Sequence, residues 1–250
     1  MCTVSLIPPS LGRGLRLVFN RDERRTRPVA WAPQLAHSGG VPVIAPVDSE
    51  SLGTWVAASG AGLVYALLNL NQGDQLMPRV ARASRGRVIP AVAGSDNLHQ
   101  ATRRLGALDV EQFGPFHLVI TDGFASATCQ WNGELLELAT CQLRQPIIVS
   151  SSSLGDDLVE GPRRALFDDL LATDADPWRA QDRLHQHAWP DRRHLSVLMT
   201  RAAARTVGRT IIVMEHDGAT MSYSPVIDGW IGPSTETRVA RLGIPLAEAG

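Results

Sequence analysis

Two groups of residues near the start of the chain have the types that acyl-transfer chemistry requires. Cys2 follows the initiator Met1, and the polar run Asn20-Arg21-Asp22-Glu23 comes later. Removal of the initiator methionine is usual before a small second residue, and it would leave Cys2 with both a thiol and a free α-amine. The unperturbed pKa of an α-amine is about 7.7–8.0, which suits a general base at neutral pH. The pattern therefore predicts a cysteine nucleophile that its own amine activates.

Each further step of this chemistry needs a partner of a particular type. A guanidinium beside the sulfur lowers the pKa of the thiol, which Arg21 could do. A carboxylate such as Asp22 or Glu23 could hold and orient the amine. Hydrogen-bond donors must face the developing oxyanion, and a remote asparagine could supply one of them. The run from Asn20 to Glu23 could also be a strand end with solvated charges, and spacing alone favours neither reading.

The elements that would position these residues are two strands over residues 2–7 and 15–20, joined by a Pro/Gly-rich turn. Side chains alternate between faces with a period of two, so the apolar pattern specifies the register. Pairing Cys2 with Arg21 places the apolar positions of both strands on one face. A slip by one residue would put Cys2 beside Asn20 and mix apolar with charged positions. We therefore expect Arg21 to be the neighbour of Cys2.

The rest of the chain alternates strand and helix patterns that are joined by hairpin signals, such as Asp-Gly and Asn-Gly. Helices are expected over 78–93, 96–108, 161–172 and 177–187, the third of them opening with Pro162. Residues 28–50 and the tail are expected to be irregular. Further strands are expected over 53–59, 62–69, 116–121, 124–131, 134–138, 146–150, 195–199, 210–216 and 219–224. This order predicts one α+β domain over residues 1–250, with antiparallel layers.

Composition limits the classes of partner and compartment. The net charge is −1, and the basic residues, all of them arginine, are spread along the chain, which argues against a nucleic-acid partner. No apolar run is long enough for stable membrane insertion, and no signal peptide is evident, so we expect a cytoplasmic protein. The three cysteines cannot form a disulfide framework or a zinc knuckle. We expect neither a metal nor a cofactor.

Other polar clusters have simpler interpretations. His185 and His187 would point to different sides of a helix, so we expect surface histidines and no metal site. Asp156-Asp157 is expected to lie in a plain loop.

Several motifs carry a family resemblance. Met1-Cys2 followed by Asn20-Arg21-Asp22-Glu23 resembles the NRDE family, also called the transport and Golgi organisation family. That family is similar to N-terminal nucleophile (Ntn) hydrolases of the penicillin V acylase and bile-salt hydrolase group. The resemblance implies a four-layer αββα sandwich of mostly antiparallel sheets. Further matching stretches are Gly53-Thr54-Trp55, Leu68-Asn69, Ser84-Arg85-Gly86 and Gly161-Pro162-Arg163-Arg164.

The resemblance implies roles for individual residues. Cys2 matches the nucleophile, Asn69 the residue whose backbone helps form the oxyanion hole, and Arg164 a later arginine, with Arg163 a near-equal candidate. The acylases separate the arginine and aspartate that follow the nucleophile by two residues, whereas Arg21 and Asp22 are adjacent here. A regular strand would turn them to opposite faces.

Either the strand therefore bulges, or Asn20 and Glu23 hold the equivalent positions. Ser150 to Ser153 also stand where the acylases have a second oxyanion asparagine, so the oxyanion hole could be reshaped or absent.

The resulting expectation is an Ntn-type cysteine amidohydrolase acting on a small-molecule amide or acyl bond other than a peptide bond. The alternative is a non-catalytic carrier or trafficking protein, in which the same cleft holds haem or a lipid or acyl ligand.

Overall fold

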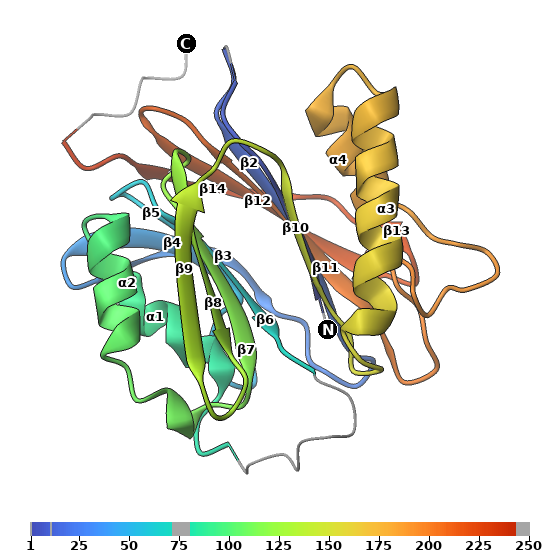
Figure 1. The fold of residues 1–250 in the computed structure, drawn as a ribbon, viewed down its shortest axis with the longest axis horizontal. Helices are drawn as coiled ribbons and strands as arrows, with labels where there is room; N and C mark the ends of the chain where they lie inside the picture. The colour runs from blue at the N-terminus through green and yellow to red at the C-terminus, as the bar shows by residue number, and fades with distance from the viewer. Residues whose placement is uncertain (1, 11, 72–80, 244–250) are drawn as a thin grey trace.

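Two antiparallel sheets face each other, and helices cover the outer face of each (Figure 1). The computed structural model describes residues 2–10, 12–71 and 81–243. Each sheet has seven strands, and the apolar core between them comes from alternate residues of both. The expected four-layer αββα sandwich of antiparallel sheets is thus confirmed.

The first sheet contains the amino-terminal strand in its interior. Its strands run in the order β10-β1-β2-β11-β12-β13, and β14 also pairs with β12. Helices α3 (Asp157–Thr173) and α4 (Pro177–His185) cover its outer face. The strands are β1 (Cys2–Ile7), β2 (Leu15–Arg24), β10 (Ile147–Ser151), β11 (Ala204–Met214), β12 (Gly218–Ile227), β13 (Trp230–Ile231) and β14 (Thr235–Ala240).

The second sheet is a meander in which strands adjacent in sequence are adjacent in space. Helices α1 (Val88–Val92) and α2 (Leu98–Gly106) pack on its outer face, with short 3₁₀ turns η2 (Arg85–Arg87) and η3 (Val110–Gln112) nearby. Its strands are β3 (Trp31–Ser38), β4 (Val41–Val47), β5 (Val56–Ser59), β6 (Val64–Asn69), β7 (Phe116–Thr121), β8 (Ala125–Trp131) and β9 (Leu136–Gln142).

The register of the first hairpin is the predicted one. Cys2 pairs with Arg21, Val4 with Phe19 and Leu6 with Leu17 across β1 and β2. Strand β1 is nevertheless buried on both faces, because α3 and α4 cover the side that carries Thr3 and Ser5. The amino-terminal strand is therefore enclosed on all sides by other elements.

The expectation of an irregular segment over residues 28–50 is wrong, because β3 and β4 lie there. Its prolines are compatible with strands at these positions. Strand β3 is the edge of its sheet, where a proline such as Pro33 removes no necessary ladder hydrogen bond. Strand β4 pairs with β5 only through Val43 and Ile44, so Pro46 lies outside that ladder. The expected irregular tail is also wrong in part, because it includes β13 and β14.

Two other expected elements differ from the structure. Residues 195–199 form turns and not a strand, although Val197 and Met199 are buried as a strand pattern would suggest. Of the expected helix over 78–93, residues 78–80 lie outside the described part of the chain, and regular α-helix is confined to α1. The third expected helix begins earlier than predicted, so Pro162 lies inside α3 and not at its start.

His185 is buried, which corrects the expectation of a surface histidine. It lies at the end of α4, its Nε2 is 2.8 Å from Ser5 Oγ, and burial holds its pKa well below the ordinary value. Helix α4 turns this ring toward β1, and the sequence gives no indication of that rotation.

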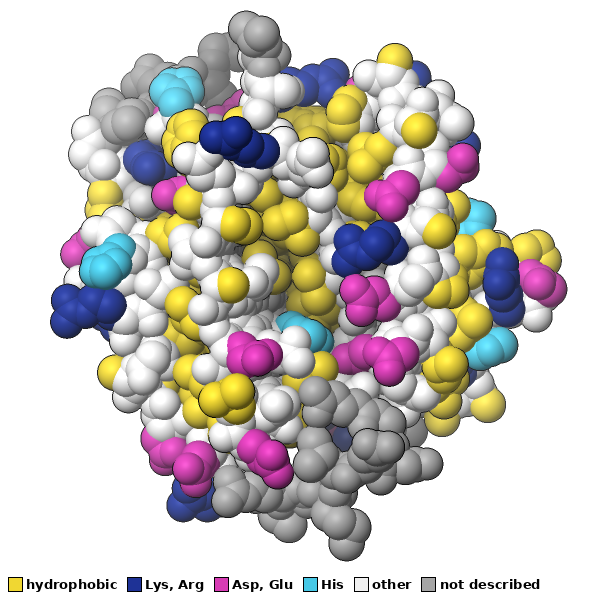
Figure 2. Space-filling view, viewed as in Figure 1, with side chains coloured by type: hydrophobic (Ala, Val, Ile, Leu, Met, Phe, Trp, Pro, Cys, Tyr) yellow, Lys and Arg dark blue, Asp and Glu magenta, His cyan; other side chains and the backbone are white. Residues whose placement is uncertain are grey.

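Charged side chains on the visible face are scattered, without one large patch of a single sign (Figure 2). None of the helices in the described part of the chain is long and apolar enough to cross a membrane.

Candidate active site

Cys2 lies between two polar neighbours on adjacent strands. It pairs with Arg21 of β2 on one side and with Ser151 of β10 on the other. Directly opposed residues of antiparallel strands project from the same face, so these three side chains form a row. Burial raises the pKa of the Cys2 thiol, while a hydrogen bond from the backbone N–H of Asp22 and the charge of Arg21 act in the opposite direction. The net effect is a pKa above the ordinary value, so these groups offset only part of the effect of burial on the Cys2 thiol.

Arg21 is held in place from two sides. Its guanidinium carbon is 4.3 Å from the ring centroid of Trp55, a cation–π contact. Its Nη2 forms a buried ion pair with Asp48, and Glu23 Oε2 is 3.6 Å away. The Arg21 guanidinium is thus fixed by Trp55 and Asp48, and part of its charge is neutralised by Asp48.

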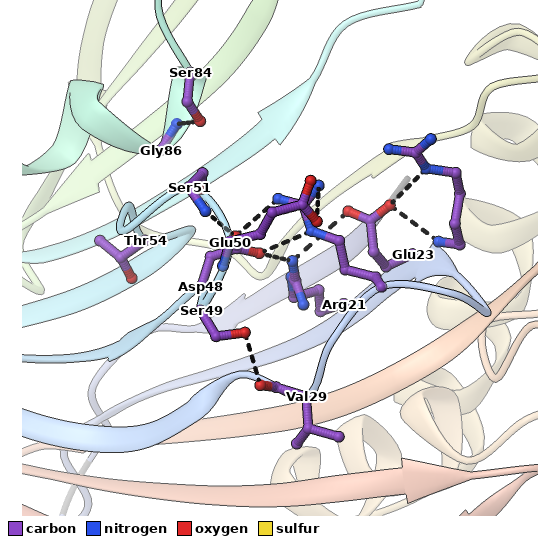
Figure 3. A network of polar contacts seen from close by, with 12 residues as sticks. Arg21, Glu23, Val29, Asp48, Ser49, Glu50, Ser51, Thr54, Ser84 and Gly86 are labelled. Carbon is purple, nitrogen blue, oxygen red and sulfur yellow. Dashed lines mark hydrogen bonds and ion pairs between the residues drawn. The ribbon is translucent and has the colours of Figure 1, made fainter.

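Asp48 is the centre of the polar network in Figure 3. It accepts hydrogen bonds from Arg27 Nη2 at 2.8 Å and from the backbone N–H of Ser51 at 2.7 Å. Although burial raises its pKa, these hydrogen bonds and the charge of Arg21 hold the pKa well below the ordinary value. Asp48 therefore remains ionised and positions Arg21. Asp48 lies in the segment over residues 28–50 that is expected to be irregular, and the sequence pattern does not predict that it positions Arg21.

Asp22 offers a free carboxylate oxygen close to the nucleophile. Its Oδ1 accepts a 2.6 Å hydrogen bond from Thr206, whereas its buried Oδ2 has no hydrogen-bond partner in the described part of the chain. Its charge raises the pKa of the Cys2 thiol, which places the two groups in electrostatic contact. Burial raises the pKa of Asp22 itself, and Arg163 is the largest influence in the opposite direction. The unpaired oxygen has the acceptor character that an α-amine on Cys2 requires.

The two arginines proposed from the α3 motif have different surroundings. Arg163 is fully buried and donates hydrogen bonds to Thr3 Oγ1 at 2.7 Å and to the carbonyl oxygen of Ser196 at 2.8 Å. Arg164 is half exposed and forms a 3.1 Å ion pair with Glu160. Arg163, the alternative candidate, is thus the one beside the nucleophile strand and Asp22.

Asn20 also points away from the site. Its Nδ2 donates to the carbonyl oxygens of His185 at 2.9 Å and Val197 at 3.0 Å, so it fixes the segment after α4 to the sheet.

A cavity of about 540 Å³ brings most of the predicted residues together. Arg21 and Asp22 are adjacent in β2, yet both line this cavity with Cys2. Asn20 and Arg164 do not. The lining residues are Cys2, Arg21, Asp22, Glu23, Arg24, Arg27, Asp48, Ser51, Gly53, Thr54, Trp55, Leu67, Asn69, Ala81, Arg82, Ala83, Ser84, Arg85 and Gly86.

Asp156 joins the segments that follow β10, the partner strand of β1, and β6, a strand of the opposite sheet. Its carboxylate accepts hydrogen bonds from the backbone N–H of Ser152 at 2.6 Å, after β10, and of Asn71 at 2.9 Å, after β6. A third bond comes from Asn71 Nδ2 at 3.1 Å. The sequence predicts a plain loop at Asp156, and only its position next to the serine run points to a further role.

Ser151 is the second neighbour of Cys2, and its hydroxyl is available for bonding. It is fully buried, and its Oγ has no hydrogen-bond partner among the residues that the structure describes. A hydroxyl can donate to an oxyanion as an amide does, although with a shorter reach.

The described residues contain no group of three or more His, Cys, Asp or Glu side chains that could hold a metal ion.

Comparison with known proteins yields one family and several solved structures. The family model described as Transport and Golgi organisation 2 matches residues 1–165. A search of curated proteins gives no match. The fold is similar to that of penicillin V acylase from Agrobacterium tumefaciens, at 10% identity and a TM-score of 0.54, covering 97% of this chain and 87% of that one.

Two further structures share the fold. The C2A mutant of conjugated bile acid hydrolase from Clostridium perfringens has 10% identity and a TM-score of 0.52, covering 96% of this chain and 92% of that one. The Caenorhabditis elegans orthologue of N-acylethanolamine-hydrolyzing acid amidase has 11% identity and a TM-score of 0.55, covering 85% and 92%. At these identities the likeness establishes the fold alone.

Proposed function

Because the chain belongs to the Transport and Golgi organisation 2 family and has the fold of the acylases described above, we propose that it is a cysteine amidohydrolase. It would cleave an amide bond other than a peptide bond, or a related acyl bond, after removal of Met1. The observation that carries the proposal is that Cys2, its strand partner Arg21 and Asp22, whose Oδ2 has no hydrogen-bond partner among the described residues, line one cavity. This set supplies a nucleophile, a stabilising cation and an amine acceptor.

In this proposal the free α-amine of processed Cys2 accepts the thiol proton while Asp22 Oδ2 orients that amine. The sulfur attacks the substrate carbonyl carbon, and the carbonyl oxygen becomes an oxyanion. The protonated amine then gives its proton to the leaving nitrogen, the C–N bond breaks, and a thioester remains. Water, deprotonated by the same amine, hydrolyses the thioester and restores the thiol.

The oxyanion would be stabilised from two strands. Ser151 has an unpaired hydroxyl beside Cys2 on β10, and Asn69 lies at the cavity end of β6. Asp156 holds the segments that follow these two residues, so it supports both donors at once. This arrangement would replace the second asparagine of the acylases by a serine.

The lining of the cavity supports a hydrolase over a carrier for haem or a lipid. Most of its described side chains are charged or carry a hydroxyl, and Trp55 and Leu67 are its large apolar members. A site that holds an apolar ligand is lined predominantly by hydrophobic and aromatic side chains.

The test is reaction of the processed protein with an electrophilic acyl probe, such as a β-lactone that carries an N-acylamino group. Intact mass first establishes that Met1 has been removed, and peptide mapping then locates the adduct. We expect acylation at Cys2, none there in Cys2→Ala, and acylation at least tenfold slower in Asp22→Asn because the amine loses its charged acceptor. The background variant is Cys141→Ser, because Cys141 is an exposed thiol. An unmodified Cys2 in processed protein would refute the mechanism.

A further inference from the structure

The Cys2 cavity contains an excess of positive charge. Five arginines and three acidic side chains line it. Two of the arginines, Arg21 and Arg27, share the carboxylate of Asp48. The charge of these two is therefore largely compensated within the protein.

Two other arginines of the cavity are mostly exposed. The side chains of Arg24 and Arg82 are 69% and 71% exposed, and their ion-pair distances are long, 4.0 Å to Glu23 and 3.8 Å to Asp109. Exposed pairs of this kind contribute little energy and leave the arginines free to move toward a ligand.

Arg85 differs from all four, because it is partly buried and has no acidic partner among the described residues. Its Nε donates a 2.8 Å hydrogen bond to the carbonyl oxygen of Pro115. Burial lowers the pKa of Arg85, and no acidic neighbour acts against that effect. Partial burial of a cation that has no acidic partner costs desolvation free energy, and an anion bound beside the cation would offset that cost.

The segment that carries Arg85 is fixed before any ligand arrives. The backbone N–H of Thr54 donates to the carbonyl oxygen of Gly86 at 2.9 Å. The segments that contain Gly53 and Gly86 are also in close contact, because a Cβ on Gly53 would lie 2.7 Å from Gly86 Cα. The guanidinium itself lies against Gly114, where a Cβ would be 2.7 Å from Arg85 Nη2. A guanidinium held in this way loses little conformational entropy when it binds a ligand.

From these contacts we infer that Arg85 is the anion-binding subsite of the cavity, and that the substrate carries a carboxylate, sulfonate or phosphate group. This inference rests on the proposed hydrolase function, whose substrate class it narrows to acidic amides. Arg24 and Arg82 at the exposed part of the lining add attraction for the same group. Guanidinium groups bind such anions through two parallel hydrogen bonds.

The experiment compares matched substrates that differ in one charge. N-octanoylglycine against N-octanoylglycinamide places the charge in the leaving group, and glutaryl against valeryl p-nitroanilide places it in the acyl group. We expect kcat/KM for the anionic member of at least one pair to exceed that of its neutral partner by about tenfold to a hundredfold, the range for a charge-assisted hydrogen bond. Equal rates in both pairs would overturn the inference.

The variants are Arg85→Gln and Arg85→Lys, with Arg87→Gln as the matched control. Arg87 belongs to the same 3₁₀ turn but is exposed and does not line the cavity. Arg85→Gln should remove the preference for the anionic substrate and leave kcat/KM for the neutral substrate within about threefold of wild type. Arg85→Lys should keep part of that preference, and Arg87→Gln should keep all of it. An equal loss for both members of a pair in folded Arg85→Gln would contradict a subsite role.

Binding separates this inference from the proposed reaction. Calorimetric titration of Cys2→Ala with N-octanoylglycine measures the subsite without turnover. Arg85-dependent binding without acylation of wild-type Cys2 would refute the hydrolase and retain the subsite. Turnover at equal rates for the charged and neutral substrates would retain the hydrolase and refute the subsite.

Discussion

Replacing Asp156 by asparagine tests whether the segments that follow β10 and β6 must be held together. The carboxylate accepts three hydrogen bonds, from Ser152 N, Asn71 N and Asn71 Nδ2. An asparagine keeps one acceptor oxygen and turns an NH₂ group toward at least one of these donors. Hydrogen bonds to a charged group contribute about 1.5–3 kcal/mol each, and a buried donor left unpaired costs a similar amount. We therefore expect Asp156→Asn to lower the free energy of unfolding by about 2–4 kcal/mol.

The functional consequence is separable from stability. Because Ser151 and Asn69 lie just before the tethered residues, loosening the tether should slow acylation of Cys2 more than it weakens substrate binding, so kcat falls and KM changes little. Urea denaturation gives the stability, and single-turnover labelling by the acyl probe gives the rate. Asp169→Asn is the control, because Asp169 is exposed on α3 and should change stability by less than about 0.5 kcal/mol. A loss below about 1 kcal/mol for Asp156→Asn, or an unchanged acylation rate in the folded variant, would refute the reasoning.

Two further predictions concern the charged groups around β2. Asp48→Asn should cost about 3 kcal/mol, because Arg21 loses its buried partner. Since the folded-state pKa of Asp48 is lowered, the stabilisation is present above the unfolded pKa of about 4 and is lost as the pH falls below it, so wild type and variant should converge in acid denaturation. A gap that stays constant down to about pH 2 would exclude this linkage. Arg163→Gln should lower stability by about 2–4 kcal/mol and slow acylation, whereas Arg164→Gln should stay within about 0.5 kcal/mol, both measured by denaturation. Equal losses of stability in Arg163→Gln and Arg164→Gln would mean that the burial of Arg163 does not contribute to stability.

The nucleophile half of the site was predictable because strands repeat every two residues. Alternation in β1 and β2 specified the register, and hence the pairing of Cys2 with Arg21. The same rule predicted that Arg21 and Asp22 point to opposite faces. It could not show that both still line one cavity, because β2 continues beyond the first residue of β1 to Arg24 and the register of β11 against β2 shifts between Thr206 and Gly208.

The remaining parts depend on packing between distant segments. Choosing Arg163 over Arg164 requires the rotation of α3 about its axis, which a mixed polar sequence does not specify. Asp48 follows a segment whose prolines lead to a prediction of irregular structure instead of strands. Asp156 accepts a hydrogen bond from the backbone of Asn71, which is distant in the sequence. Such contacts leave no local pattern in the sequence.

The interior position of β1 has a consequence for the order of maturation. Strand β2 follows within the same hairpin, whereas β10 is synthesised much later. Until β10 emerges from the ribosome, one edge of β1 is open and a processing peptidase can reach the bond before Cys2. Once residues 147–151 have paired with β1, both edges are occupied. Under the proposed function, which requires removal of Met1, this topology would favour trimming during translation, before β10 pairs with β1.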